Sequence, residues 1–251
     1  MPASSPYASL PNTSFWKRSV AGISALDVDP VLQAPFAISE KDAVATAGSC
    51  FAQHISRTLS AKGFNYFVTE FGPEERGYGV YPSRFGNIYT VRQLLQTFER
   101  AYGLREADPS VWVRGEKFVD PFRPQIEADG FSTTEGLEAD RATHLASVRK
   151  MFEGCDVFIF TLGLTEGWQT ENGNVVPLAP GVAGGPENPL AVYSKKNFSV
   201  NEMVSDFNRF LSLLRTVNPD VKVLLTVSPV PLIATYEDNH VLQSNTYSKS
   251  A

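Results

Sequence analysis

Three apolar runs separated by amphipathic segments dominate the chain from residue 43 onwards. Residues 43–47 form a short apolar run, and residues 157–162 and 221–227 form longer, mainly apolar ones. Runs that lack polar alternation are typical of strands buried on both faces, as in parallel sheets. We therefore expect buried strands at 157–162 and 221–227, a shorter strand at 43–47, and a second short strand at 64–68.

The segments between these runs carry apolar residues at helical spacing. They are residues 51–62, 90–102, 132–152 and 199–217. The last two begin with the Ser-x-x-Glu capping box that marks a helix N-terminus, at Ser132 with Glu135 and at Ser199 with Glu202. Strands that alternate with helices predict an α/β domain with a mostly parallel sheet and right-handed crossovers. A small hairpin is expected at 111–120.

Two regions of the chain lack this periodicity. We interpret residues 1–35 as an extended N-terminal arm, because proline breaks helices, and residues 36–251 as one domain. The prolines of the arm are Pro2, Pro6, Pro11, Pro30 and Pro35. Residues 171–198 are rich in glycine and proline and are expected to form a long loop at the pocket entrance.

Composition narrows the function classes. A formal net charge of −5 argues against nucleic acid as the main partner, since phosphate binding needs a basic face. No apolar stretch is long enough for a signal peptide or a membrane span, and two cysteines make a disulfide framework improbable. These features favour a cytoplasmic protein that does not bind membranes. The composition does not indicate an oligomeric state.

Cofactor signals are absent from the sequence. No glycine-rich phosphate loop follows a predicted strand, and the three histidines lie far apart, without the spacing of zinc ligands. We therefore expect neither a cofactor nor a metal.

The candidate chemistry lies at Gly48-Ser49-Cys50, where the first strand turns into a helix. Gly48 permits a tight turn there. The first helical N–H groups have no partner within the helix and favour negative charge, so they can hold an oxyanion. Ser49 is then placed as a nucleophile. The alternative is that Ser49 simply caps the helix.

Four sequence blocks resemble the GSCFA family. They are Gly48-Ser49-Cys50-Phe51-Ala52, residues 85–90 (FGNIYT), residues 161–168 (TLGLTEGW), and residues 228–232 (SPVPL) continuing to Ser248-Lys249-Ser250. The family looks like a branch of the SGNH hydrolases, which are flavodoxin-like esterases with helices on both faces of the sheet. The resemblance implies a serine esterase or acyl hydrolase that acts on a small ester or an acylated carbohydrate.

The resemblance also assigns roles to individual residues. Ser49 matches the nucleophile, and the backbone N–H of Ser49 or Cys50 is the expected first oxyanion donor. Gly86 and Asn87 are candidate further donors, although turn chemistry explains Asn87 equally well. Further candidates follow the strand at 157–162. There Gly163, Thr165 and Glu166 stand where the superfamily has Gly-x-Asn-Asp, so Thr165 offers a hydroxyl instead of an amide, and Glu166 either orients a neighbour or acts as a structural cap.

The expected Asp-x-x-His does not occur in these residues. Asp238 and His240 are separated by one residue instead of two, and His240 is the nearest candidate for the catalytic base. The chain therefore looks like a shortened family member. Because nucleophile and base act as a unit, a chain without its base should be nearly inactive.

Two other readings stay open. One is a catalytically impaired protein that binds carbohydrate or acts as a scaffold, in which Trp16, Trp112, Trp168 or Tyr193 stacks on sugars. The other uses Cys50 as the nucleophile, because a helix N-terminus lowers the pKa of a thiol.

Overall fold

The computed structural model describes residues 5–251, and the chain divides into one unit that ends at Ile38 and a second unit, Ser39–Ala251. The first unit contains three short helical turns, Asn12–Ser14, Lys17–Ala21 and Ala25–Asp27. The prediction of a wholly extended arm is therefore wrong, and residues 1–4 of that arm lie outside the described residues. The prolines do not prevent these turns, because Pro11 precedes the first turn instead of interrupting it.

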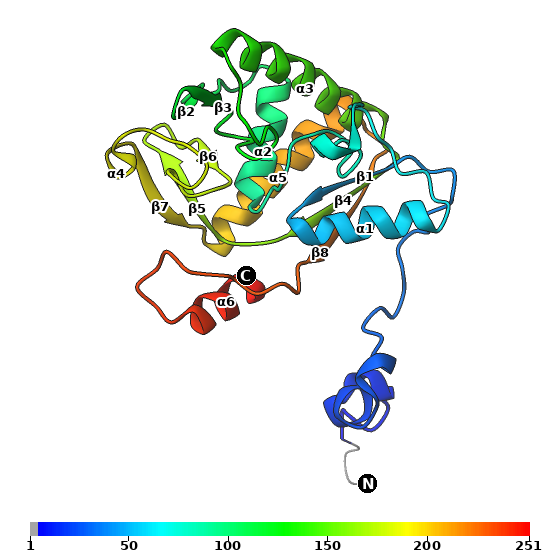
Figure 1. Ribbon diagram of the computed structural model, residues 1–251. Helices are drawn as coiled ribbons and strands as arrows, with labels where there is room; N and C mark the ends of the chain where they lie inside the picture. The colour runs from blue at the N-terminus through cyan, green and yellow to red at the C-terminus, as the bar shows by residue number, and fades with distance from the viewer. Residues whose placement is uncertain (1–4) are drawn as a thin grey trace. The chain divides into compact units, whose positions relative to one another are not determined.

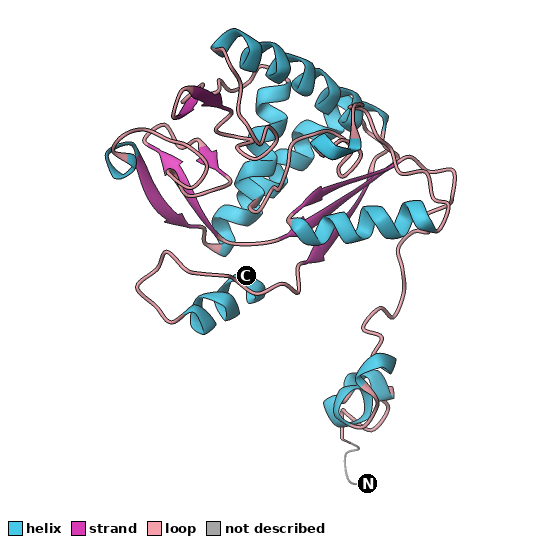
Figure 2. Ribbon diagram, in the orientation of Figure 1, coloured by secondary structure: helices cyan, strands magenta, loops and turns pink. Residues whose placement is uncertain are grey.

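A three-stranded parallel sheet lies at the centre of the second unit (Figures 1 and 2). Its strands are β1 (Val44–Gly48), β4 (Val157–Leu162) and β8 (Lys222–Val227), in the order β1-β4-β8. Gly48 pairs with Thr161, which in turn pairs with Thr226, so the three strands end at the same edge. The predicted α/β class with a mostly parallel sheet is confirmed, and it is consistent with a flavodoxin-like fold.

The third strand differs from the prediction that it is buried on both faces. The middle strand β4 is almost wholly buried, whereas β8 exposes Leu224, Leu225 and Val227, with relative exposures of 37%, 42% and 53%. The exposure of β8 follows from its place in the sheet. Within residues 5–251, β8 pairs only with β4 and forms an edge of the sheet.

Helices flank this sheet (Figure 1). Helix α1 (Cys50–Ala61) contacts β1 and β4, whereas α2 (Val91–Ala101), α3 (Thr134–Gly154) and α5 (Val200–Val217) contact one another. Their shared core is aromatic. The Phe152 ring lies 5.2–5.7 Å from the rings of Phe98, Phe158 and Phe210, and these four side chains are buried.

The predicted helix starts are largely correct. Ser199 and Glu202 form the expected capping box of α5, and a second box at Thr90 and Gln93 starts α2. Helix α3 begins one residue later than expected, because the Thr133 hydroxyl accepts the amide hydrogen of Gly136 and takes the capping role given to Ser132.

Two antiparallel sheets and the helices α4 and α6 complete the unit (Figure 2). The hairpin of β2 (Trp112–Arg114) and β3 (Lys117–Val119) confirms its prediction. The expected loop at 171–198 instead contains β6 (Val175–Val176), α4 (Pro189–Val192) and β7 (Tyr193–Asn197), and β5 (Glu166–Thr170) pairs with both strands. The predicted strand at 64–68 is reduced to one bridge, between Tyr66 and Val44. A short turn, Glu74–Arg76, precedes α2, and α6 (Val241–Ser250) follows β8.

Candidate functional site

A tight turn at Gly48 sets the position of Ser49. The φ angle of Gly48 is +145°, a conformation that favours glycine. A Cβ atom at this position would lie 2.7 Å from the carbonyl oxygen of Thr161 in the neighbouring strand. Glycine is therefore required both by the backbone conformation and by the close approach of β4.

The Ser49 hydroxyl has no hydrogen-bond partner among residues 5–251. The residue is 5% exposed and occupies the N-cap position of α1, yet its Oγ accepts no helical amide hydrogen. The cap hydroxyl of Ser199, by contrast, bonds the amide of Glu202. The first amides of α1 therefore remain free of a side-chain cap, and they point toward the turn with the positive end of the helix dipole.

Ser49 borders a cavity of about 400 Å³ at the carboxyl edge of the parallel sheet. Ligands of open α/β sheets bind at this edge. Each of the three strands contributes the residue that follows it: Ser49 after β1, Gly163 after β4 and Ser228 after β8. The lining is mainly apolar, and its other members are Cys50, Tyr89, Leu164, Pro177, Leu178, Ala179, Val182, Val230, Pro231, Leu232, Ile233, Ala234, Tyr236 and Lys249.

Gly163 allows the loop after β4 to approach the serine. A Cβ at Gly163 would lie 3.5 Å from the Ser49 Cβ and 3.0 Å from the carbonyl oxygen of Tyr89. The carbonyl oxygen of Gly163 accepts a hydrogen bond from the Lys249 Nζ at 2.9 Å. Lys249 was not identified from the sequence, although it lies in one of the blocks that carry the family resemblance.

Asn87 supports the turn from outside the cavity. The Tyr81 hydroxyl donates to the Asn87 Oδ1 at 2.6 Å and lies 3.1 Å from the Ser49 carbonyl oxygen. The Asn87 amide donates to the Tyr89 hydroxyl at 3.0 Å. Neither Asn87 nor Gly86 lines the Ser49 cavity; both border smaller neighbouring cavities. Of the predicted oxyanion donors, Gly86 and Asn87 therefore lie outside the Ser49 cavity, whereas Cys50 and Gly163 line it.

Tyr89 is a cavity residue that was not singled out from the sequence. It lines the cavity, and because its oxygen accepts from Asn87, its own hydroxyl hydrogen remains available as a donor. Burial raises the pKa of Tyr89, so the hydroxyl keeps this hydrogen at neutral pH. Its position in the block at residues 85–90 is the sequence feature that could have identified it, beside the predicted Gly86 and Asn87.

Thr165 and Glu166 hold the loops around the cavity without lining it. The backbone amide of Thr165 donates to the Ser248 hydroxyl at 3.1 Å, and the Thr165 hydroxyl is buried without a partner. The Glu166 carboxylate accepts from the Thr235 hydroxyl at 2.7 Å and from the Tyr236 amide at 2.8 Å. Glu166 therefore orients the 235–236 loop, the positioning alternative noted from the sequence.

None of the three histidines lies in the Ser49 cavity. His240, the candidate base, is exposed and caps α6, where its Nδ1 accepts the Leu242 amide hydrogen at 3.2 Å. His240 therefore caps its own helix and lies outside the Ser49 cavity. His54 is exposed on α1, and His144 is buried on α3.

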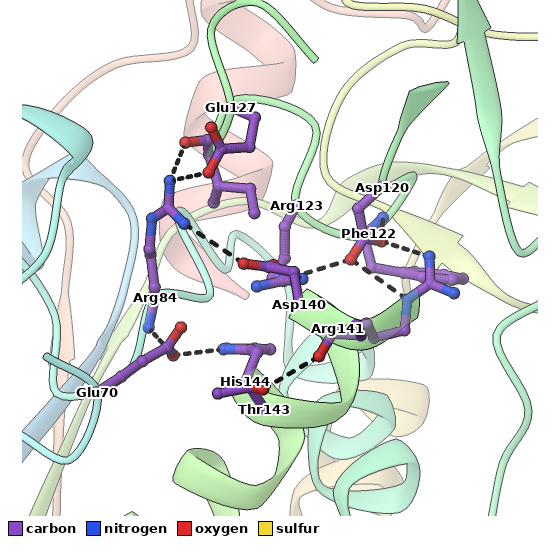
Figure 3. A network of polar contacts seen from close by, with 12 residues as sticks. Glu70, Arg84, Asp120, Phe122, Arg123, Glu127, Asp140, Arg141, Thr143 and His144 are labelled. Atoms are coloured by element: carbon purple, nitrogen blue, oxygen red, sulfur yellow. Dashed lines mark hydrogen bonds and ion pairs between the residues drawn. The ribbon is translucent and has the colours of Figure 1, made fainter. Parts of the chain in front are cut away.

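A buried ionic network joins α3 to the segment that leads to Asn87 (Figure 3). The Asp120 carboxylate contacts the Arg123 Nε at 2.9 Å and the Arg141 guanidinium at 3.1 Å. Arg123 also reaches Asp140 at 2.8 Å, and Arg84 reaches Glu127 at 2.7 Å. The network extends to Glu70, whose Oε2 accepts the Arg84 amide hydrogen at 2.7 Å and lies 2.7 Å from the His144 Nδ1.

Burial decides the protonation of this network. It lowers the pKa of His144 to about 4, so the neutral imidazole donates its Nδ1 hydrogen to Glu70. It also lowers the pKa of Arg100 to about 9. One guanidinium nitrogen of Arg100 and one of Arg123 lack a partner among the described residues, and both side chains border a cavity of about 30 Å³, which is large enough for water.

Among residues 5–251, no cluster of three or more histidine, cysteine or acidic side chains is arranged to hold a metal ion. No helix in this range has the length and apolar character needed to cross a bilayer.

The fold and the cavity together define an α/β protein with a candidate active site at the carboxyl edge of a parallel sheet. The model of the GSCFA family matches residues 43–251, and the chain belongs to that family. A comparison with curated proteins found no match, and a comparison with solved structures found none either.

Proposed function

We propose that this protein is a serine esterase or acyl hydrolase in which Ser49 forms an acyl-enzyme with a small ester or an acylated carbohydrate. The Ser49 Oγ attacks the ester carbonyl, the alcohol leaves, and water then releases the acid and regenerates the serine. The observation that carries this proposal is the buried Ser49 hydroxyl, which has no partner and borders the cavity at a helix N-terminus.

The surroundings of Ser49 support stabilisation of an oxyanion. The amide hydrogens at the start of α1 are donors beside the serine, and Tyr89, which lines the same cavity, carries a further hydroxyl donor. Removal of one donor from such a site typically costs about 2.7–4 kcal/mol of barrier lowering. The likeness to SGNH hydrolases in the sequence blocks supports the same chemistry.

The proton acceptor is the weakest part of this machinery. Attack by Ser49 requires a base, and no histidine of the chain lines the cavity. A serine site that lacks its base retains only about 10³–10⁴-fold catalysis over water. The proposal is therefore tested by covalent labelling of Ser49, because a single slow attack leaves a stable adduct that accumulates during a long incubation.

The test is reaction with an alkyl fluorophosphonate, followed by mass spectrometry of the peptide that contains Ser49. The Oγ–P bond forms as fluoride leaves, so we expect one stable mass shift on Ser49 and none in Ser49→Ala. Ser228→Ala is the matched control, because Ser228 lines the same cavity but its hydroxyl accepts the Val230 amide hydrogen. This control should label like the unaltered protein.

The same reaction separates the serine from the neighbouring thiol. Cys50 is exposed and lines the cavity. Labelling that survives Ser49→Ala but disappears in Cys50→Ala assigns the nucleophile to the thiol. No labelling of Ser49 in the unaltered protein, under conditions that label a known serine esterase, contradicts the proposal.

A second candidate function is ligand binding without catalysis. The absence of histidine from the cavity favours it, as does the engagement of Glu166 with the 235–236 loop. Sugar stacking on Trp112 and Tyr193 does not, because both side chains are buried against each other. Ligand affinity that is unchanged in Ser49→Ala, together with no labelling, favours binding alone.

A further inference from the structure

Lys249 is the one charged residue among those that line the Ser49 cavity. It lies in the last turn of α6, and its half-buried side chain enters a lining that is otherwise apolar or neutral. Charged groups are seldom placed in apolar surroundings without a partner, because desolvation is costly. The groups that contact this ammonium group therefore indicate what Lys249 does.

The described residues accept only one hydrogen bond from this ammonium group. The Nζ donates one hydrogen bond, to the carbonyl oxygen of Gly163 at 2.9 Å. An ammonium group has three donors. Among residues 5–251 no carboxylate lies within the 4.0 Å of an ion pair with Lys249, whereas Lys196 on the nearby β7 pairs with Glu202 at 2.6 Å. Burial lowers the pKa of Lys249, and no acidic group offsets this effect.

The contact with Gly163 joins the ammonium group to the loop that approaches Ser49. Gly163 is the residue whose backbone approaches the Ser49 side chain. The adjacent Ser248 accepts the amide hydrogen of Thr165, so α6 holds the Gly163 loop at two points. The hydroxyl and the cation therefore border one cavity through one shared loop.

We propose that Lys249 binds an anionic group of the ligand, so that the substrate is an ester with an apolar part and a carboxylate or similar anion. This inference rests on the proposed function for the identity of the reacting bond, but not for the binding of the anion. The apolar walls take up the hydrocarbon portion, and the free donors of Lys249 take up the charge. The competing reading is that Lys249 only clamps the Gly163 loop.

Binding of two amides that the proposed chemistry leaves intact separates these readings. The probes are the monoanilide of glutaric acid, which carries a carboxylate, and the neutral butyranilide, which has a similar apolar part. Isothermal titration of the unaltered protein should give at least about tenfold tighter binding of the acid, the difference expected of one hydrogen bond to a charged group. Because no ester is cleaved, the result does not depend on Ser49 acting as a nucleophile.

Substitutions then locate the preference. Lys249→Met should abolish it, and Lys249→Arg should retain most of it. Lys62→Met is the matched control, because Lys62 is exposed at the end of α1 and its loss changes the net charge equally. Equal binding of the two amides to the unaltered protein overturns the inference even if Lys249→Met fails to fold. A preference that persists in Lys249→Met, or that Lys62→Met removes equally, also overturns it.

Discussion

The Ser49 cavity and the ionic network of α3 differ in whether their buried polar groups have partners. In the network every carboxylate contacts an arginine or a histidine, and Asp120 alone receives hydrogen bonds from Arg123, Arg141 and the Phe122 amide. In the cavity, the described residues offer the Ser49 hydroxyl no hydrogen-bond partner and Lys249 no carboxylate. A folded protein normally satisfies such groups.

The difference separates structural from functional polarity. The paired charges of the network hold α3 against the loops around it. Removing one member of such a buried ion pair is strongly destabilising, because the other member is left as an unpaired buried charge. Unsatisfied groups beside a cavity are available to a ligand. The two unpartnered guanidinium nitrogens of Arg100 and Arg123 qualify this division, and the small cavity they border is polar and large enough for water.

The largest expected effect is the loss of the Asp120 carboxylate. Burial alone would raise the pKa of Asp120, but Arg123 and Arg141 hold it well below its ordinary value. Asp120→Asn leaves these two arginines without their shared counter-ion. We expect a loss of about 3–5 kcal/mol in the free energy of unfolding, measured by urea denaturation.

The control for this substitution is Asp129→Asn in the exposed loop that follows. Asp129 is exposed, so its substitution should change the free energy of unfolding by less than about 0.5 kcal/mol. If Asp120→Asn costs no more than Asp129→Asn, the network does not stabilise the fold, and its contrast with the Ser49 cavity fails.

The next effect is a dependence of stability on pH through His144. Its folded pKa of about 4 lies below the unfolded value of about 6.5. The unfolded chain therefore binds the proton first, and stability is fully present above about pH 6.5 and is lost as the pH falls toward 4. The loss attributable to His144 should reach about 2–3 kcal/mol.

A histidine substitution isolates this contribution. His144→Gln should reduce the loss of stability between about pH 6.5 and 5, measured by urea denaturation at constant ionic strength. His54→Gln, at an exposed histidine of α1, should leave the pH dependence unchanged. An identical pH dependence in His144→Gln and the unaltered protein would show that another group is responsible.

The fold could be predicted from the sequence where local pattern decides it. Helix starts at Ser199 and strand β4 follow from capping residues and an apolar run, and both are present. The exposure of β8 could not be predicted, because an apolar run does not say which strand will lie at an edge. The sheet within 171–198 was missed because its strands are short and separated by glycine and proline.

The candidate site was predicted only in its first element. Gly48 and Ser49 are adjacent in sequence, so the turn and the helix start reveal them. Lys249 lies 200 residues further along, and no local sequence pattern predicts that α6 returns to the Gly163 loop. His240 was chosen by residue type near the expected motif, and its capping contact depends on the exact start of α6.

The smallest effect tests Ser49 itself. If Ser49 were only a helix cap, Ser49→Ala would cost about 0.5–2 kcal/mol of stability, as cap removal usually does. Its hydroxyl makes no cap bond, and it is buried without a partner. Removal should therefore leave the free energy of unfolding unchanged or raise it by up to about 1 kcal/mol.

Ser199→Ala is the matched control, because the Ser199 hydroxyl does cap α5, and we expect this substitution to cost about 1 kcal/mol. Urea denaturation of both variants ranks them. Equal losses at the two serines would make Ser49 a structural cap and remove the contrast between a satisfied network and a cavity with a free hydroxyl.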